Sequence, residues 1–303
     1  MSAPGRDCPL SYRYAGNAFA GEPALSAETL WIAGGLYGNR FALQALLEAF
    51  EAEPGDKALI FNGDFHWFDA EAEEFASIDV AVSRHVATRG NVETEIAAPE
   101  AGAGCGCGYP HWVGDATVAH SNRIMERLRG AARASGRDLA RLAALPMTLL
   151  ARVGGERVGI VHGDAESLAG WNFAQEILAT PAGAAAAERQ FARSGVRVFA
   201  SSHTCLPVLQ RFPGERVLVN NGAAGMPNFR GERYGIATRV SVRPHAGALY
   251  AARSEGLHVE AVALRYDAGA WEKRFLALWP AGSDAHQSYY ERIVSGPAFE
   301  RAA

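Results

Sequence analysis

The chain has few cysteines, no excess of charge of one sign and no long hydrophobic run, and each shortage excludes a class of protein. Four cysteines in 303 residues are too few and too unevenly spaced for the disulfide framework of a small secreted domain. No apolar run reaches the length of about 18 residues that a membrane-spanning helix needs, and the first residues lack the basic start and apolar stretch of a secretory signal. We therefore expect a cytoplasmic protein with reduced thiols and no membrane partner.

The charge balance is close to even. The chain has 29 Lys and Arg residues against 33 Asp and Glu residues, for a net charge of -4. Nucleic acids and anionic lipids bind through concentrated positive charge, so neither is expected as a partner. A chain of this length can bury a large core, and we expect one domain over residues 1–303. The sequence leaves the oligomeric state open.

Apolar runs rich in β-branched residues alternate with helical patterns, which is typical of an α/β protein. Strands are expected at residues 29–33, 57–62, 86–89, 147–153, 157–161 and 196–201, and shorter antiparallel strands at 208–211, 216–219, 236–242, 249–253 and 257–265. Helices are expected at residues 40–52, 116–133, 171–178 and 184–192. The core, about residues 28–265, carries a glycine-rich loop insertion at 94–114 and a C-terminal helical extension at 269–296.

Four of the predicted strands run directly into a residue that can bind a metal. These residues are Asp64, Asn91, His162 and His203. Strands of one sheet bring their carboxyl ends to a common edge, so we expect the four side chains to converge. One carboxylate, one amide oxygen and two imidazoles suit a divalent transition metal such as Mn, Fe or Zn. Each residue taken alone is also explained as an ordinary turn or core residue.

The order of these motifs resembles the calcineurin-like metallophosphoesterase superfamily. The motifs are GD at 63–64, GN at 90–91, HGD at 162–164, SHT at 202–204 and NNG at 220–222, and the helix sequence GNRFALQALLEAF resembles the smaller, phosphodiesterase-like members. The resemblance covers residues 28–265. It implies a four-layer α-β-β-α sandwich of two mixed sheets flanked by helices, a two-metal site at the strand ends, and hydrolysis of phosphomonoesters or phosphodiesters.

Two motifs depart from the superfamily pattern. Its first motif, Asp-x-His-Gly-Asn, reads GLYGN at 35–39, and its last motif, Gly-His-x-His, reads SHTC at 202–205. The resemblance assigns Asp64, Asn91, His162 and His203 to one metal, and all four are present. Of the ligands of the other metal, only the shared Asp64 remains. We therefore expect a mononuclear or altered site, with the presence of a second ion left open.

The histidine that often follows the third-motif Asn in this superfamily, and that protonates the leaving group, is replaced by Val92. His66, two residues beyond Asp64, is the nearest substitute in the sequence and is the candidate catalytic residue. A histidine beside a cation stays largely neutral, which suits a base or a substrate contact. The alternative is that His66 simply packs beside Trp67 and Phe68.

Three cysteines are candidate additional metal or thiol ligands. Cys205 stands where the last motif has its final histidine, and Cys105 and Cys107 lie in the glycine-rich loop soon after Asn91. Thiolates bind Zn and Fe well, and a nearby cation lowers the pKa of cysteine. The alternative to metal binding is that the three thiols are redox-active or inert.

Three residues at the start of the first predicted helix are candidate phosphate-binding residues: Tyr37, Asn39 and Arg40. Exposed backbone N–H groups at a helix start favour anions. The leading functional hypothesis is a metal-dependent hydrolase of a small phosphorylated molecule. The alternatives are an inactive descendant that binds a phosphorylated ligand, a metal or a protein partner, and a thiol or redox protein centred on the three cysteines.

Overall fold

The computed structural model describes residues 4–300, and within this range the strands form two six-stranded mixed sheets. The strand order of the first sheet is β1-β5-β6-β7-β9-β8. Its strands are β1 (Leu25–Ala27), β5 (Thr148–Val153), β6 (Glu156–Val161), β7 (Val198–Ser201), β8 (Pro207–Phe212) and β9 (Arg216–Asn221). Strands β6, β7 and β9 run parallel to one another, so their carboxyl ends share one edge.

The strand order of the second sheet is β11-β12-β10-β2-β3-β4. Its strands are β2 (Thr29–Ala33), β3 (Lys57–Asn62), β4 (Val86–Thr88), β10 (Gly235–Ser241), β11 (Ala248–Ser254) and β12 (Leu257–Leu264). Strands β2, β3 and β4 are parallel, whereas β10 joins β2 antiparallel. On its other side β10 pairs antiparallel with β12, which in turn pairs antiparallel with β11.

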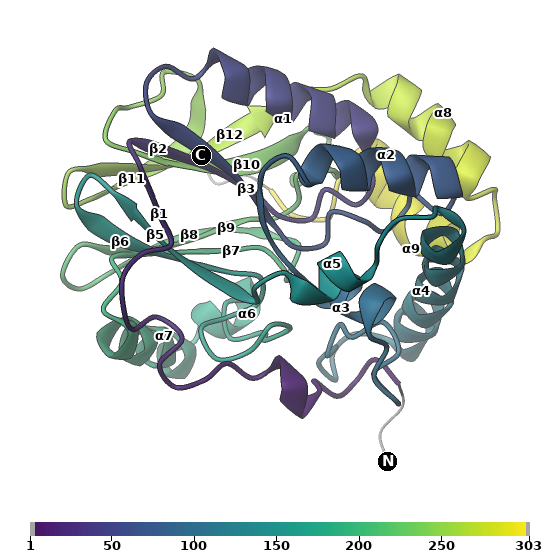
Figure 1. Cartoon of the computed structure of the whole chain (residues 1–303), viewed down its shortest axis with the longest axis horizontal. Coiled ribbons are helices and arrows are strands. Elements are labelled where there is room, and N and C mark those ends of the chain that lie inside the picture. The colour runs from purple at the N-terminus through teal and green to yellow at the C-terminus, as the bar shows by residue number, and fades with distance from the viewer. Residues whose placement is uncertain (1–3, 301–303) are drawn as a thin grey trace.

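Helices cover the outer faces of both sheets and one end of the molecule (Figure 1). They are α1 (Arg40–Ala52), α2 (Ala72–Val82), α3 (Asn91–Ala97), α4 (Asp115–Ala134), α5 (Ala140–Ala144), α6 (Gln175–Leu178), α7 (Pro181–Ser194), α8 (Ala268–Leu278) and α9 (Asp284–Ser295), with a short 3-10 turn η1 (Leu10–Tyr12) near the N-terminus. In Figure 1, α1, α2 and α8 lie over the second sheet, and α6 and α7 lie under the first. The predicted four-layer α-β-β-α sandwich is confirmed.

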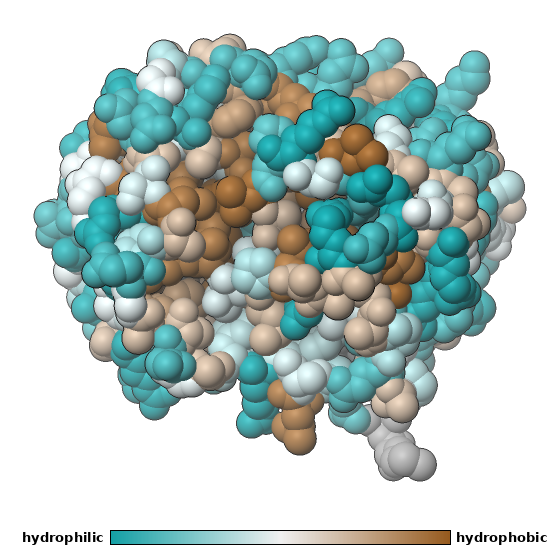
Figure 2. Space-filling view, in the orientation of Figure 1, coloured by the Kyte–Doolittle hydropathy of each residue, from teal (hydrophilic) through white to brown (hydrophobic). Residues whose placement is uncertain are grey.

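Each layer boundary has its own hydrophobic cluster. Between the sheets, residues such as Ile60 of β3 and Ile160 of β6 pack together, and Phe191 of α7 packs against Phe199 of the first sheet. On the face seen in Figure 2, hydrophobic residues gather in a band across the left half, where Figure 1 shows β1, β2 and β3. The shared core between the sheets places the two sets of parallel strand ends next to each other.

The strands were largely predictable, but several helices were not. Helices α2, α3 and α5 lie in segments for which no helix was predicted, and the helix expected at 171–178 is limited to α6. Helix α3 occupies residues 94–97 of the expected loop, so the irregular segment is 98–114. None of the helices in the described part of the chain is both long and apolar enough to cross a membrane.

Candidate metal centre

The first candidate ligand, Asp64, lies in a tight turn after β3. Both Gly63 and Asp64 have positive φ, at 73° and 51°, and the buried carboxylate of Glu93 holds this turn by accepting the backbone N–H groups of Asp64 (2.8 Å), Phe65 (3.0 Å) and Gly90 (2.8 Å). A Cβ on Gly63 would come within 2.5 Å of Nδ1 of His162. Glycine at 63 is therefore required by close approach as well as by backbone conformation.

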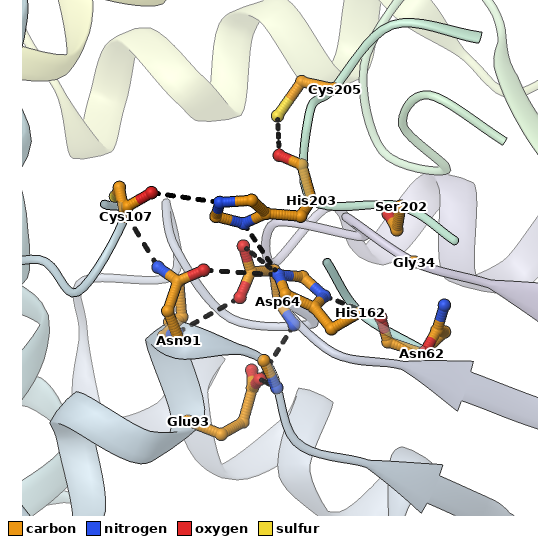
Figure 3. Close-up of polar contacts among 12 residues, drawn as sticks. Gly34, Asn62, Asp64, Asn91, Glu93, Cys107, His162, Ser202, His203 and Cys205 are labelled. Atoms are coloured by element: carbon orange, nitrogen blue, oxygen red, sulfur yellow. Dashed lines mark hydrogen bonds and ion pairs between the residues drawn. The ribbon is translucent and has the colours of Figure 1, made fainter. Parts of the chain in front are cut away.

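The four predicted ligands converge at one point between the two sheets (Figure 3). Nε2 of His162 lies 3.3 Å from Oδ2 of Asp64, 3.2 Å from Oδ1 of Asn91 and 3.2 Å from Nδ1 of His203. Asp64 and Asn91 follow β3 and β4 of the second sheet, whereas His162 and His203 follow β6 and β7 of the first. The expectation of convergence at the edge of a single sheet is wrong, because each sheet contributes two of the ligands.

Hydrogen bonds on the far side of each ring set the chemistry of the two histidines. Nδ1 of His162 lies 2.9 Å from the carbonyl of Asn62, and Nε2 of His203 lies 3.0 Å from the carbonyl of Cys107. A carbonyl only accepts, so each of these ring nitrogens carries a proton. In the neutral rings, the lone pairs of Nε2 of His162 and Nδ1 of His203 then face the common point, which is the arrangement in which metal-binding histidines are held.

The electrostatics of the group match a cation site. Burial raises the pKa of Asp64, but the interaction with His162 lowers it by more than burial raises it. The net pKa of Asp64 therefore lies below its usual value. Burial and the proximity of His162 lower the pKa of His203 to about 3, so its ring is neutral. Asp64, His162 and His203 form a group of ligand atoms within 4.8 Å of one another. Burial lowers the pKa of His162, but the Asp64 carboxylate raises it more, so its net pKa lies above its usual value. One carboxylate, one amide and two imidazoles, all buried and aimed at one point, fit a divalent ion that would take the place of the His162 proton.

The glycine-rich segment orients two of the ligands through its backbone. The side-chain amide of Asn91 donates to the carbonyl of Cys105 (3.0 Å), which leaves the amide oxygen facing the other ligands, and His203 donates to the carbonyl of Cys107. The four glycines at 102, 104, 106 and 108 all have positive φ. Glycine at every second position allows this backbone, in which two alternate carbonyls serve the same site.

Known structures of the same architecture exist, although no protein-family model and no curated protein matches the chain. A hypothetical protein from Pyrococcus horikoshii OT3 superimposes with a TM-score of 0.61 at 17% identity, over 90% of this chain and 99% of that one. A metallophosphoesterase from Sphaerobacter thermophilus superimposes with a TM-score of 0.56 at 16% identity, over 89% of this chain and 100% of that one. The chain has the metallophosphoesterase fold. The resemblance seen in the sequence is thus confirmed as a shared fold.

Protein side chains fill the place where the resemblance implies a second ion. Tyr37 is buried, and its hydroxyl lies 2.8 Å from the thiol of Cys205, which also donates to the carbonyl of His203 (3.1 Å). A Cβ on Gly35 would come within 2.9 Å of the Tyr37 ring. Burial is the main cause that raises the pKa of Tyr37 and of Cys205, so both groups are protonated. A phenol and a thiol thus occupy the place where the superfamily pattern has metal ligands.

His66 does not join the ligand group. Its Nδ1 lies 2.5 Å from Oδ2 of Asp69, its Nε2 lies 4.0 Å from Asp79, and its ring stacks on Phe75 at 3.8 Å between centroids. Burial lowers the pKa of His66, but Asp69 raises it more, to about 9. Asp79 also pairs with Arg137 (2.6 Å). His66 is therefore a charged partner of Asp69, and of Asp79 of α2, in the core, and the prediction of a catalytic role has no support in this geometry.

The other predicted phosphate ligands are engaged elsewhere. Asn39 is the N-cap of α1: its side-chain oxygen accepts the N–H groups of Phe41 and Ala42 (both 3.1 Å), and its amide donates to the carbonyl of Gly225. The Arg40 guanidinium is half exposed and lies 3.6 Å from Glu74 of α2. Neither side chain is available to a phosphate at the ligand group.

The cysteines are free thiols, and the group of ligand atoms found among the described residues contains none of them. Cys105 and Cys107 are buried, and the Cys107 sulfur accepts a hydrogen bond from the amide of Asn91 (3.5 Å). The contribution of Cys105 and Cys107 to the site is made by their carbonyls. Thiolate ligation of the metal has no support in this arrangement.

Two residues that contact the site were not predicted from the sequence. Glu93 holds the Asp64 turn, and Trp171 donates from its indole N–H to the carbonyl of Cys107 (3.0 Å) while its ring meets His203 edge-on at 5.3 Å between centroids. An acid two residues after the strand-end Asn91 is a usable signal for Glu93. No local pattern marks Trp171, because its contact depends on how the glycine-rich segment folds.

Proposed function

We propose that this protein is a metal-dependent phosphoesterase that uses one divalent ion at Asp64, Asn91, His162 and His203 and acts on a small phosphorylated molecule. The observation that carries the proposal is the convergence of four donors whose remote hydrogen bonds leave their lone pairs facing one point. Two imidazoles with one carboxylate and one amide suit Mn, Fe or Zn better than Mg or Ca.

The residues of the chain would hold and shield this ion. A divalent cation bound there supplies Lewis-acid activation of a phosphate ester and of water. Glu93 keeps the Asp64 carboxylate in place, while the carbonyls of Cys105 and Cys107 orient Asn91 and His203. Asp64 and His203, each about 5% exposed, are the two ligands that reach the surface most. A site this enclosed suits a small phosphate ester. The proposal includes the cytoplasmic location that we expect from the composition.

The experiment is a metal and activity assay on matched variants. Purified protein loaded with Mn, Fe or Zn is tested for hydrolysis of p-nitrophenyl phosphate and bis-p-nitrophenyl phosphate, with metal content measured in parallel. We expect turnover that His162→Ala abolishes and that His258→Ala, a change at a partly exposed histidine of β12, leaves unchanged. Equal rates in wild type and His162→Ala, or no turnover by metal-loaded wild type, would overturn the proposal.

One observation favours a second candidate function, a non-catalytic metal or phosphate-binding protein. The place of the second ion is filled by Tyr37 and Cys205, and Val92 stands where a leaving-group acid is often found. A protein of this kind would bind one ion tightly and show no hydrolysis with either aryl phosphate. Turnover that is lost on chelation and restored by the metal would reject it.

A further inference from the structure

A large cavity lies next to the metal-binding group. Its volume is about 780 Å³, and its walls are the N-terminal segment around residues 13–20, the segment 164–172 and the end of α7. This volume falls within the range of small-molecule sites in proteins. Trp171 lines the cavity and also contacts His203, so one side chain separates the cavity from a candidate metal ligand.

Two polar groups in the cavity wall lack partners. Gln190 of α7 is 5% exposed, and its side-chain oxygen makes no hydrogen bond within the described residues; the buried hydroxyl of Tyr14 is in the same state. A buried polar group without a partner costs free energy, so such groups in a cavity wall indicate what a ligand or ordered water must supply. The amide oxygen of Gln190 requires a donor, such as a hydroxyl group.

The cavity wall also carries positive charge. Arg13, Arg157 and Arg193 line it, against the carboxylates of Asp164 and Glu166. Asp164 is already used in accepting backbone N–H groups from the segment 166–172. Arg157 donates to backbone carbonyls of the N-terminal segment, and Arg193 has only a loose contact with Glu166, at 3.6 Å.

Arg13 is the least engaged of the three cavity arginines. Within residues 4–300, its guanidinium makes no hydrogen bond or ion pair. Guanidinium groups with free donors favour phosphate or carboxylate, which they bind with paired hydrogen bonds.

We propose that this cavity binds the part of the substrate that does not react, and that the substrate is a hydroxylated organic phosphate with a second anionic group. This inference rests on the proposed function for the position of the reacting phosphate. Trp171 forms the wall between the two subsites, Gln190 and Tyr14 bind hydroxyl groups, and Arg13 and Arg193 bind the second anion.

The test measures binding of fructose 1,6-bisphosphate, fructose 6-phosphate and inorganic phosphate to the metal-loaded full chain by calorimetry. We expect the bisphosphate to bind most tightly, and Arg13→Ala and Gln190→Leu each to weaken it by about tenfold, the effect of losing one hydrogen bond to a charged or buried partner. Arg189→Ala, at an exposed position of α7 outside the cavity wall, is the matched control and should leave binding unchanged. Circular dichroism and thermal unfolding establish that each variant folds.

The outcomes separate this inference from the proposed function. If the protein hydrolyses aryl phosphates but binds the bisphosphate no better than inorganic phosphate, or if the cavity variants bind it like wild type, the cavity holds only solvent and the inference is overturned. If aryl phosphates are not hydrolysed while the bisphosphate binds and the cavity variants weaken it, the proposed function fails and the ligand site stands.

Discussion

The two metal positions that the superfamily resemblance implies differ sharply in this structure. At the position formed by Asp64, Asn91, His162 and His203, every donor is present and each far-side hydrogen bond is satisfied. At the other position, Asp64 is the remaining expected ligand, and a hydrogen-bonded phenol and thiol take up the space. The place that the resemblance gives to a second ion, called the closed position below, therefore holds two side chains that are hydrogen-bonded to each other, whereas the group of four donors is called the open position.

The changes at the closed position depend on one another. The ring of Tyr37 lies so close to Gly35 that any Cβ there would come within 2.9 Å of it. The hydroxyl of this tyrosine in turn needs the partner that the Cys205 thiol supplies, because a buried hydroxyl without a partner is costly. Restoring a single ligand would therefore strain the site without rebuilding it.

The largest expected effect comes from removing the negative charge of Asp64, the one anionic ligand at the open position. Asp64→Asn keeps a residue type that tolerates the positive φ of 51° but removes the anionic ligand, so the bound ion should be lost completely. Tyr37→Phe and Cys205→Ala should each retain the ion, since their side chains belong to the closed position. Elemental analysis of the three variants after dialysis measures this. Loss of metal in Cys205→Ala as complete as in Asp64→Asn would identify the thiol as a ligand.

Rebuilding the closed position is the next test. A triple variant with Gly35→Asp, Tyr37→His and Cys205→His restores the superfamily ligands and removes the ring that blocks residue 35. We expect the bound metal to double, and aryl phosphate hydrolysis to rise at least about tenfold because a two-metal clamp stabilises both attacking and leaving oxygens.

The control for this rebuilding is Gly35→Asp alone, which should lower the melting temperature and leave the metal content unchanged because the Tyr37 ring still fills the space. A triple variant that folds, as judged by its circular dichroism, and still binds the same amount of metal as wild type would show that the backbone at this position no longer accommodates an ion.

The open position could be predicted from the sequence because its signals are local. Asp64, Asn91, His162 and His203 each follow a short apolar run, and that pattern needs no knowledge of distant residues. The pairing of strands could not be predicted from the sequence. For example, β10 pairs with β2 across some 200 residues of chain, and such pairings decide which strands belong to which of the two sheets that share the site.

The predictions for His66 and Asn39 differ from the structure because they too depend on contacts that the local sequence does not show. The distance along the chain places His66 near the metal, but its ring stacks on Phe75 of α2, a helix whose apolar and β-branched composition hides its helical period. The position of Asn39 at a helix start predicts a phosphate contact, but in the structure its side chain caps that helix. Sequence neighbours indicate which residues are available, whereas contacts between elements decide where each side chain points.

A smaller effect is expected from the backbone that orients the open position. Gly106→Ala adds a Cβ that would overlap the hydroxyl of Tyr12 at a positive φ of 70°, so the carbonyls of Cys105 and Cys107 must shift. Metal affinity should fall by about 10 to 100-fold, the usual cost of disturbing the partners of metal ligands. Competition with a chelator measures the affinity.

Two sets of control variants test whether a loss of metal affinity comes from displaced carbonyls, from backbone strain or from the thiols. Gly102→Ala places the same strained residue at a φ of 86° in open space, so it should lower stability without changing metal affinity. Cys105→Ala and Cys107→Ala keep both carbonyls and should bind the metal nearly as wild type does. If the cysteine variants lose affinity while Gly106→Ala does not, the thiols and not the carbonyls serve the site.

The smallest effect concerns Asn39, the last residue of the first motif, whose side chain caps α1. Asn39→Ala removes the side-chain acceptor for the N–H groups of Phe41 and Ala42 and should lower the free energy of unfolding by about 1–2 kcal/mol, the cost of losing a helix cap. Asn39→Ser retains a capping oxygen and should recover part of this loss, although it lacks the donor to Gly225. Urea denaturation measures both values, and metal affinity should be the same in the two variants and wild type. A drop in metal or phosphate affinity in Asn39→Ser, with stability largely restored, would mean that this residue serves the open position directly.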